Sequence, residues 1–269
     1  MRLLRAGGLV ALCAAAAIYL GIMAMLYVEQ REIQYHPDNA ATGPAPAEYA
    51  VSHVRVPGAG SVLVWSIPAA PDGAPTFVFF SGNAARITDF ADTGLLFHLR
   101  GWGVVLASYR GFSGNPGTPT QDGLMADARA VLASLPHRGK LIVWGHSLGS
   151  GVAAQMAAEH RADGLVLESA YTSAADVGQR RYWMFPVRWL MRDPFDTGSL
   201  VPRIKVPVLL IHGTNDSTIP FDMSQTLAKE LGKQATLVPV PYVDHVPHRI
   251  DLSPVVAQWL AHAGLAGAK

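Results

Sequence analysis

KLIVWGHSLG, residues 140–149, is the stretch of this chain that decides its fold. A short apolar, β-prone run leads into a Gly-x-Ser-x-Gly pentapeptide, and an Ala-rich, helix-prone run follows at residues 150–160. A serine at a sharp turn from strand to helix has its Oγ exposed. The two glycines make such a turn possible, because a missing Cβ lets the helix pass close to the strand. We therefore predict that Ser147 is an activated nucleophile. The pattern alone also fits a Gly-rich turn before a helix, so the partners of Ser147 decide.

Strands and helices alternate on both sides of this stretch. Two β-like runs at 51–56 and 61–67 predict a hairpin; further strands are expected at 76–80, 103–108, 140–144, 165–167, 206–212 and 236–240. Helices are expected at 87–100, 122–135, 150–160, 224–231 and 254–262. This alternation predicts an α/β fold with a mostly parallel sheet that helices cover on both faces. Active sites of such sheets lie at the carboxyl ends of the strands.

An acid and a base follow Ser147 in the order that this turn requires. A serine hydroxyl needs a base to take its proton, and the base needs a third group that holds its tautomer. Where a fold uses this turn, the order is Ser, then Asp or Glu, then His. Asp216 and His245 each lie just beyond a predicted strand, so we predict a catalytic triad of Ser147, Asp216 and His245. Glu168 is a rival acid, and His248 is a rival base.

The same loops predict an oxyanion hole and no metal site. A tetrahedral intermediate needs two N–H donors for its oxyanion. We expect the backbone N–H of Leu148, at the start of the helix, and the backbone N–H of Asn83, in the loop after the strand at 76–80. A metal site built on His245 and His248 lacks further ligands at a suitable spacing. No metal is therefore expected.

The N-terminal segment predicts a membrane anchor. Residues 6–28 carry no charge over 23 residues, which is long enough to cross a bilayer as a helix. A cleaved signal peptide is the alternative, but its apolar core is usually shorter and ends at a small-x-small site. Arg2 and Arg5 precede the span, so the positive-inside rule keeps the N-terminus cytosolic and places the domain on the extracytoplasmic side.

Composition excludes several classes of protein. The net charge of +1 gives no reason to expect a nucleic-acid partner. The one cysteine, Cys13, lies in the apolar span, and the bulky Leu12 before it argues against a lipoprotein acylation site. With 269 residues, the chain is long enough for one large domain held by its core alone.

The ordered motifs resemble those of the α/β-hydrolase superfamily, and within it single-pass, membrane-anchored hydrolases of the α/β-hydrolase domain-containing kind. The matching stretches are YHP at 35–37, SGNA at 81–84, YRGFSG at 109–114, GHSLG at 145–149 and HGTND at 212–216. This resemblance implies a serine hydrolase that acts on esters, thioesters or amides without a cofactor. Three positions depart from the usual pattern: Ser81 stands in place of His, Ser108 in place of Asp, and Asp244 in place of the Gly before the catalytic His.

We accordingly divide the chain into an anchor at 1–28, a linker at 29–50 and an α/β-hydrolase domain at 51–269 with a short cap at 170–205. Aromatic residues, methionines and arginines alternate at 180–192. They fit the roof of an acyl pocket, a membrane-contacting surface, or a helix on the sheet with arginines at its rim. We predict a membrane-anchored hydrolase of an ester or thioester, with a lipid-like or acyl substrate. A serine peptidase and a non-catalytic binding protein remain as alternatives.

Overall fold

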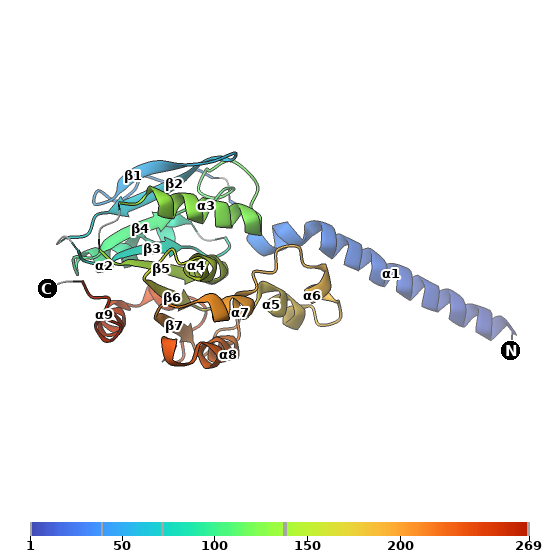
Figure 1. Cartoon of the computed structure of the whole chain (residues 1–269). Helices are drawn as coiled ribbons and strands as arrows, with labels where there is room; N and C mark the ends of the chain where they lie inside the picture. Colours follow the sequence, from blue (N-terminus) through green and yellow to red (C-terminus); the bar gives the residue numbers. More distant parts are fainter. Residues whose placement is uncertain (1, 39, 71–72, 85, 137–138, 268–269) are drawn as a thin grey trace.

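A computed structural model describes residues 2–38, 40–70, 73–84, 86–136 and 139–267 of the chain. Within these residues, eight strands form one sheet in the order β1-β2-β4-β3-β5-β6-β7-β8 (Figure 1). The strands are β1 (Ala50–Val56), β2 (Gly60–Ile67), β3 (Thr76–Phe80), β4 (Gly103–Ala107), β5 (Leu141–His146), β6 (Gly164–Glu168), β7 (Val208–Gly213) and β8 (Ala235–Val240). The pairs β1–β2 and β2–β4 are antiparallel, and the other five are parallel. The prediction of a mostly parallel sheet is therefore confirmed.

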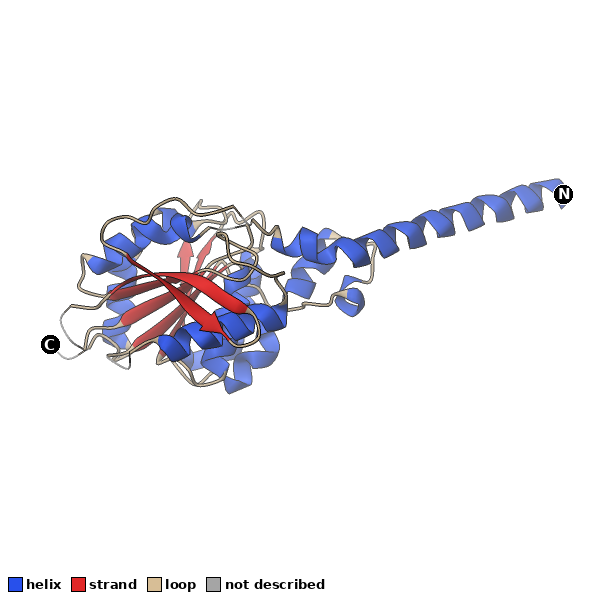
Figure 2. Ribbon diagram, turned by 90° about the horizontal axis from the view of Figure 1, so that it is seen from above, coloured by secondary structure: helices blue, strands red, loops and turns tan. Residues whose placement is uncertain are grey.

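Helices cover both faces of the sheet, as Figure 2 shows from above. The side chains of α3 (Gln121–Ser134), α4 (Leu148–Ala158) and α8 (Phe221–Leu231) share one hydrophobic cluster with alternate strand residues such as Val78 and Phe80. Those of α2 (Ala91–His98) and α9 (Ser253–His262) share a second cluster with the intervening residues, Phe77 and Phe79 among them. Burial on both faces explains why the central strands read as continuous apolar runs.

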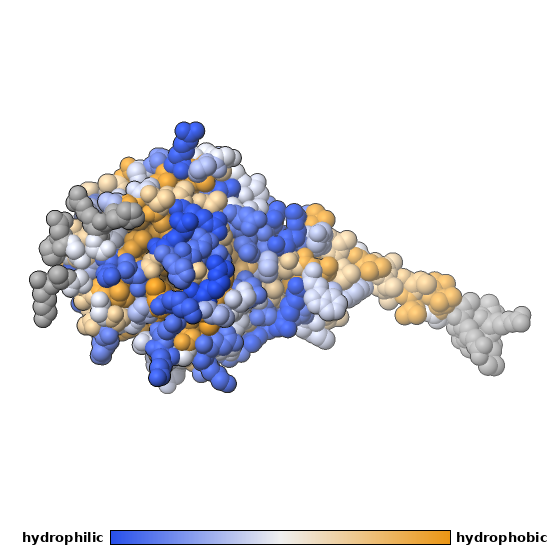
Figure 3. Space-filling view, in the orientation of Figure 1, coloured by the Kyte–Doolittle hydropathy of each residue, from blue (hydrophilic) through white to orange (hydrophobic). Residues whose placement is uncertain are grey.

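The N-terminal helix α1 (Arg2–Tyr35) projects from the domain (Figure 1). Its part from Gly7 to Tyr35 is long and apolar enough to cross a membrane, and Figure 3 shows apolar residues along the projecting part. The helix continues seven residues beyond the expected start of the linker at residue 29, so the expected linker is wrong for residues 29–35. The extra turns are helical because they pack on the domain; Tyr35 is fully buried. The helix ends just before Pro37, and His36 has a positive φ of 45°.

Short helices form the cap between β6 and β7. They are α5 (Ala174–Arg181), α6 (Val187–Leu190), α7 (Thr197–Leu200) and a single 3₁₀ turn, η2 (Val201–Arg203); other 3₁₀ turns are η1 (Ile87–Phe90), η3 (Gly232–Gln234) and η4 (Pro247–Arg249). In Figure 1, α5 and α6 lie beside the domain-proximal half of α1. Side chains of Phe185, Val187 and Leu190 line a cavity together with residues of α1. The segment 180–192 therefore faces α1 rather than forming a helix on the sheet.

Candidate active site

The turn between β5 and α4 holds Ser147 in a strained conformation. Its φ of 51° and ψ of −120° lie in a region that a residue with a side chain rarely adopts. On both sides of Ser147 the backbone passes too close for a side chain. A Cβ on Gly145 would lie 2.2 Å from the carbonyl oxygen of Gly149, and a Cβ on Gly149 would lie 2.1 Å from the carbonyl oxygen of Phe80. The Ser147 N–H donates to the carbonyl of Glu168 over 2.9 Å. The expected sharp corner is thus present, and both glycines are sterically required.

The three predicted triad residues meet at the carboxyl end of the sheet. His245 Nε2 lies 2.8 Å from Ser147 Oγ, and His245 Nδ1 lies 2.8 Å from Asp216 Oδ2. Because Asp216 is an acceptor, the Nδ1 of His245 carries the proton, which leaves Nε2 free to accept from the serine hydroxyl. Each residue comes from a different loop: Ser147 follows β5, Asp216 follows β7 and His245 follows β8. This arrangement is that of a nucleophile, a base and an orienting acid.

Asp216 is held by more groups than the sequence indicated. Its Oδ1 accepts the N–H groups of Thr218 and Ile219 over 2.9 and 2.8 Å, and His212 Nε2 lies 3.1 Å from Oδ2. Burial alone would raise the pKa of Asp216, but the hydrogen bonds from His212 and His245 outweigh it and hold that pKa well below its ordinary value. The acid is therefore ionised throughout the neutral range.

His212, the first residue of the HGTND stretch, positions Asp216. Its Nε2 faces two acceptors, Asp216 Oδ2 and the carbonyl of Ile219, so this nitrogen carries the proton. Its Nδ1, 2.6 Å from Ser224 Oγ, then accepts from that hydroxyl. The signal available in the sequence was its place at the end of β7, four residues before Asp216.

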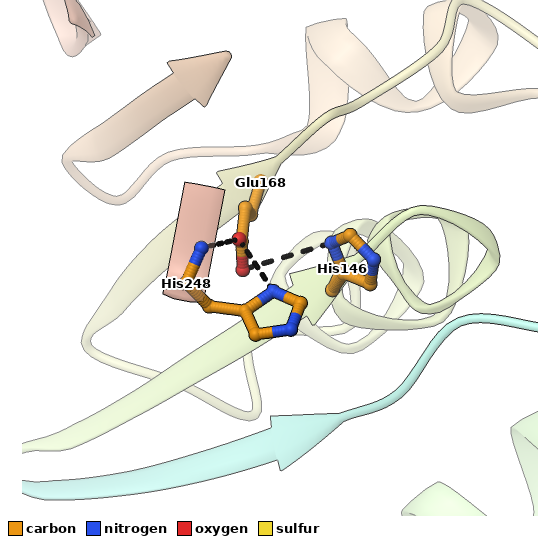
Figure 4. A group of neighbouring side chains, drawn as sticks. All are labelled: His146, Glu168 and His248. Atoms are coloured by element: carbon orange, nitrogen blue, oxygen red, sulfur yellow. Dashed lines mark hydrogen bonds and ion pairs between the residues drawn. The ribbon is translucent and has the colours of Figure 1, made fainter. Parts of the chain in front are cut away.

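The rival acid and the rival base pair with each other instead of joining Ser147. Glu168 Oε1 accepts the backbone N–H of His248 over 2.6 Å and lies 2.8 Å from His248 Nδ1; Oε2 accepts the indole N–H of Trp144 over 2.8 Å. His146 Nδ1 lies 3.7 Å from Oε2 (Figure 4). Burial would raise the pKa of Glu168, but the two histidines and the donated hydrogen bonds lower it. The carboxylate thus anchors the loop that carries His245 to the sheet.

His146, Glu168 and His248 also form a cluster of potential metal ligands. Ligand atoms of His146, Glu168 and His248 lie within 4.8 Å of one another, so His248 has neighbours of ligand type that the sequence spacing did not reveal. However, both Glu168 oxygens already accept N–H donors, and His248 Nδ1 needs its proton to donate to Glu168. The donor set is therefore that of a hydrogen-bond network, and we assign no cation to it.

The loop of Gly82 and Asn83 and the first residue of α4, Leu148, lie next to Ser147. A Cβ on Gly82 would lie 3.1 Å from Ser147 Cβ, which places the loop of Gly82 and Asn83 against the nucleophile. Leu148 opens α4, so its N–H points from the helix N-terminus with no acceptor in the preceding turn. The side-chain amide of Asn83 donates to the carbonyl of Gln34 over 3.0 Å, which fixes this loop on α1.

A polar cavity of about 540 Å³ opens beside these residues. Ser147, His245 and Asn83 line its floor, and Asp89, Asp92 and Arg249 are among its charged walls. Asp244, which stands in place of the usual Gly before His245, has a structural role. Asp244 accepts the N–H of Ser217 over 2.8 Å and so ties the base loop to the acid loop.

Comparison with known proteins identifies the family of this chain. The α/β hydrolase fold family model matches residues 75–201. An uncharacterized protein of Mycobacterium tuberculosis (strain H37Rv) is 31% identical over 261 residues, covering 91% of this chain and 90% of that protein. The chain belongs to the α/β-hydrolase family.

Two further similarities concern proteins with a stated activity. The lysophosphatidylserine lipase ABHD12 of Macaca fascicularis is 30% identical over 148 residues, covering 47% of this chain and 37% of that protein. The solved Pyrococcus furiosus esterase Pf2001 superposes with a TM-score of 0.68 at 18% identity, covering 84% of this chain and 98% of that one. At this identity, the esterase supports the fold alone.

Proposed function

We propose that this chain is a membrane-anchored serine hydrolase that cleaves a carboxylic ester or thioester through an acyl-enzyme. The observation that carries the proposal is the continuous contact from Ser147 Oγ through His245 to Asp216, with both distances at 2.8 Å. Support also comes from the relationship to a lysophosphatidylserine lipase and from the α/β-hydrolase fold. The apolar helix α1 supplies the anchor, and Arg2 and Arg5 before the span favour an extracytoplasmic domain.

The geometry leads to the following chemistry. Ser147 Oγ attacks the substrate carbonyl while its proton passes to His245 Nε2, and Asp216 stabilises the imidazolium that forms. The N–H groups of Asn83 and Leu148 hold the developing oxyanion. The tetrahedral intermediate collapses, and the leaving alcohol or thiol takes the proton from His245. Water then attacks the acyl-enzyme with His245 again as the base, which releases the acid and restores Ser147.

Fluorophosphonate labelling of the full chain tests the nucleophile. We expect the native protein to be labelled and Ser147→Ala to be unlabelled. Equal labelling of both, or no labelling of the native protein, contradicts the proposal and favours a non-catalytic binding protein. A panel of esters, thioesters and peptides then separates an esterase from a peptidase, since cleavage of peptides alone overturns the ester assignment.

The assignment of the base is tested with a matched pair of histidine variants. His245→Asn removes the proton acceptor of Ser147, and we expect kcat to fall by about 10⁴-fold, as for loss of a triad function. His248→Asn keeps an N–H donor near Glu168, and we expect activity within about tenfold of native because this side chain bonds a structural carboxylate. The reverse ranking would make His248 the base.

A further inference from the structure

An apolar cavity of about 650 Å³ lies between α1 and the cap. Its α1 wall includes Met23, Leu26 and Ile33, and its cap wall includes Val177, Phe185 and Leu190. The volume lies in the range of roughly 300–1,000 Å³ that is typical of ligand sites. One wall is therefore made by the same helix that is the candidate membrane span.

This cavity lies next to the candidate active site. Asn83 lines both the apolar cavity and the polar cavity that contains Ser147 and His245. Ser217 and Thr218, directly after Asp216, line the apolar cavity as well. Asn83, in the loop against Ser147, thus separates an apolar cavity from the polar cavity that holds the candidate nucleophile. This arrangement suits a substrate with a long hydrocarbon on one side of its carbonyl and a polar group on the other.

Specific contacts fix the walls of the cavity. The Tyr19 hydroxyl donates to the carbonyl of Met184 over 2.9 Å, and its ring stacks on Phe185 at 5.1 Å. Further along the helix, Gln30 Oε1 accepts the N–H of Arg192 over 2.6 Å. Tyr19, Met23, Leu26 and Gln30 repeat at intervals of four, three and four residues, so they lie on one face of α1. This face is built to contact the cap.

The outer end of the cavity lies inside the stretch of α1 that is the candidate membrane span. Residues 7–18 of α1 are all exposed, but the uncharged stretch 6–18 spans only about 20 Å of helix. The ~30 Å hydrocarbon thickness of a bilayer therefore extends past Tyr19 to the docked part of α1 and the tip of the cap. The cap tip beside Tyr19 carries exposed large side chains, with Trp183 at 75%, Met184 at 60% and Trp189 at 90% exposure. Tryptophans are favoured at the boundary between hydrocarbon and headgroups.

From these observations we propose that the cavity between α1 and the cap binds the acyl chain of an ester lipid drawn from the bilayer. The proposal rests on the proposed function and adds that α1 is part of the substrate site. The acyl chain lies against Leu26 and Leu190, its carbonyl reaches Ser147, and the polar leaving group occupies the polar cavity. Because the chain leaves one apolar environment for another, the fit of the cavity walls decides how strongly it binds, and a side chain that fills the cavity excludes it.

The experiment uses the full chain in phosphatidylcholine nanodiscs with p-nitrophenyl butyrate and p-nitrophenyl palmitate. Leu26→Trp and Leu190→Trp each fill the cavity from a different wall. We expect each to lower the palmitate-to-butyrate ratio of kcat/KM by about tenfold, near the lower end of what overpacking a fitted apolar site costs. Met25→Trp is the matched control: Met25 is 58% exposed on a different face of α1 and should keep the native ratio.

A second measurement does not depend on turnover. A phosphatidylcholine with a diazirine at the end of its acyl chain should cross-link to residues 23–33 of Ser147→Ala, and Leu26→Trp in that background should reduce the cross-link. The inference is overturned if the native protein hydrolyses butyrate while both cavity variants keep the native ratio and the cross-link persists. Absence of both hydrolysis and fluorophosphonate labelling in the native protein overturns the proposed function, and the inference with it.

Discussion

At the scale of single residues, His146 shows how tightly this site is packed. The residue is only 5% exposed, and its ring packs against the rings of Phe90, His245 and His248. Burial lowers the pKa of His146 to about 3, against the partly opposing effect of Glu168. His146 is therefore neutral near neutral pH, so it adds no positive charge beside His245.

This buried histidine predicts an acid-sensitive fold. Between pH 6.5 and 3 the unfolded chain binds a proton at His146 that the folded chain does not bind, so stability falls as the pH falls. One such proton corresponds to about 1.4 kcal/mol per pH unit. We expect His146→Phe to remove this contribution to the pH dependence of the free energy of unfolding between pH 6 and 4.5. Urea unfolding of the full chain in a nonionic detergent measures it, and an unchanged slope in the variant would contradict the expectation.

The catalytic candidates could be predicted from the sequence because each of them ends a strand. Ser147, Asp216 and His245 stand in the order that the strained turn requires, and parallel strands bring their carboxyl ends to one edge. The pairing of Glu168 with His248 could not be predicted in the same way. It depends on the path of the loop after β8, which brings residues 80 positions apart into contact and leaves no periodic pattern in the sequence.

At the scale of elements, the contact between α1 and the cap is the least predictable feature. Residues 6–28 are apolar on every face of the helix, as a membrane span requires. The face of α1 that contacts the cap, from Tyr19 onward, therefore has no distinct hydrophobic pattern in the sequence. The expected linker over residues 29–35 failed for the same reason: polar residues after an apolar span resemble a tether. Their partners, such as Asp193, lie about 160 residues away and become visible only in three dimensions.

Asp193 joins three elements, which predicts a clear effect of its removal. Its carboxylate accepts Arg31 Nε over 2.7 Å and the N–H of Gln121 at the start of α3 over 3.2 Å. Asp193→Ala leaves these donors unpaired and should lower the free energy of unfolding by about 2 kcal/mol. It should also speed amide hydrogen exchange in residues 19–35.

An exposed ion pair serves as the control for Asp193. Arg180 and Asp222 form a bidentate contact, but both side chains are at least half exposed. Asp222→Ala should therefore change stability by no more than about 0.5 kcal/mol and leave exchange in α1 unchanged. Equal effects of the two alanine variants would show that the Asp193 contact does not hold α1 to the domain.

At the scale of the whole molecule, thiol labelling tests on which side of the membrane the domain lies. Cys13 is the one cysteine in the sequence and lies in the proposed span. A membrane-impermeant maleimide should not label the native protein in intact cells, because hydrocarbon shields this thiol. Leu99→Cys places a thiol on the domain at a position that is 81% exposed, and it should be labelled. Labelling only after permeabilisation would place the domain in the cytosol.

The docking of α1 along the cap has a consequence for the reach of the proposed membrane-anchored hydrolase. A flexible tether would let the domain swing and sample molecules at many heights above its membrane. In this structure, Tyr19 and Gln34 of α1 donate hydrogen bonds to the cap and hold the domain against a rigid helix. The cap lies along the part of that helix nearest the domain. With α1 as the proposed anchor, Ser147 stands at one fixed height above the bilayer. We therefore expect the proposed hydrolase to act in cis, on molecules of its own bilayer, and not on an apposed membrane.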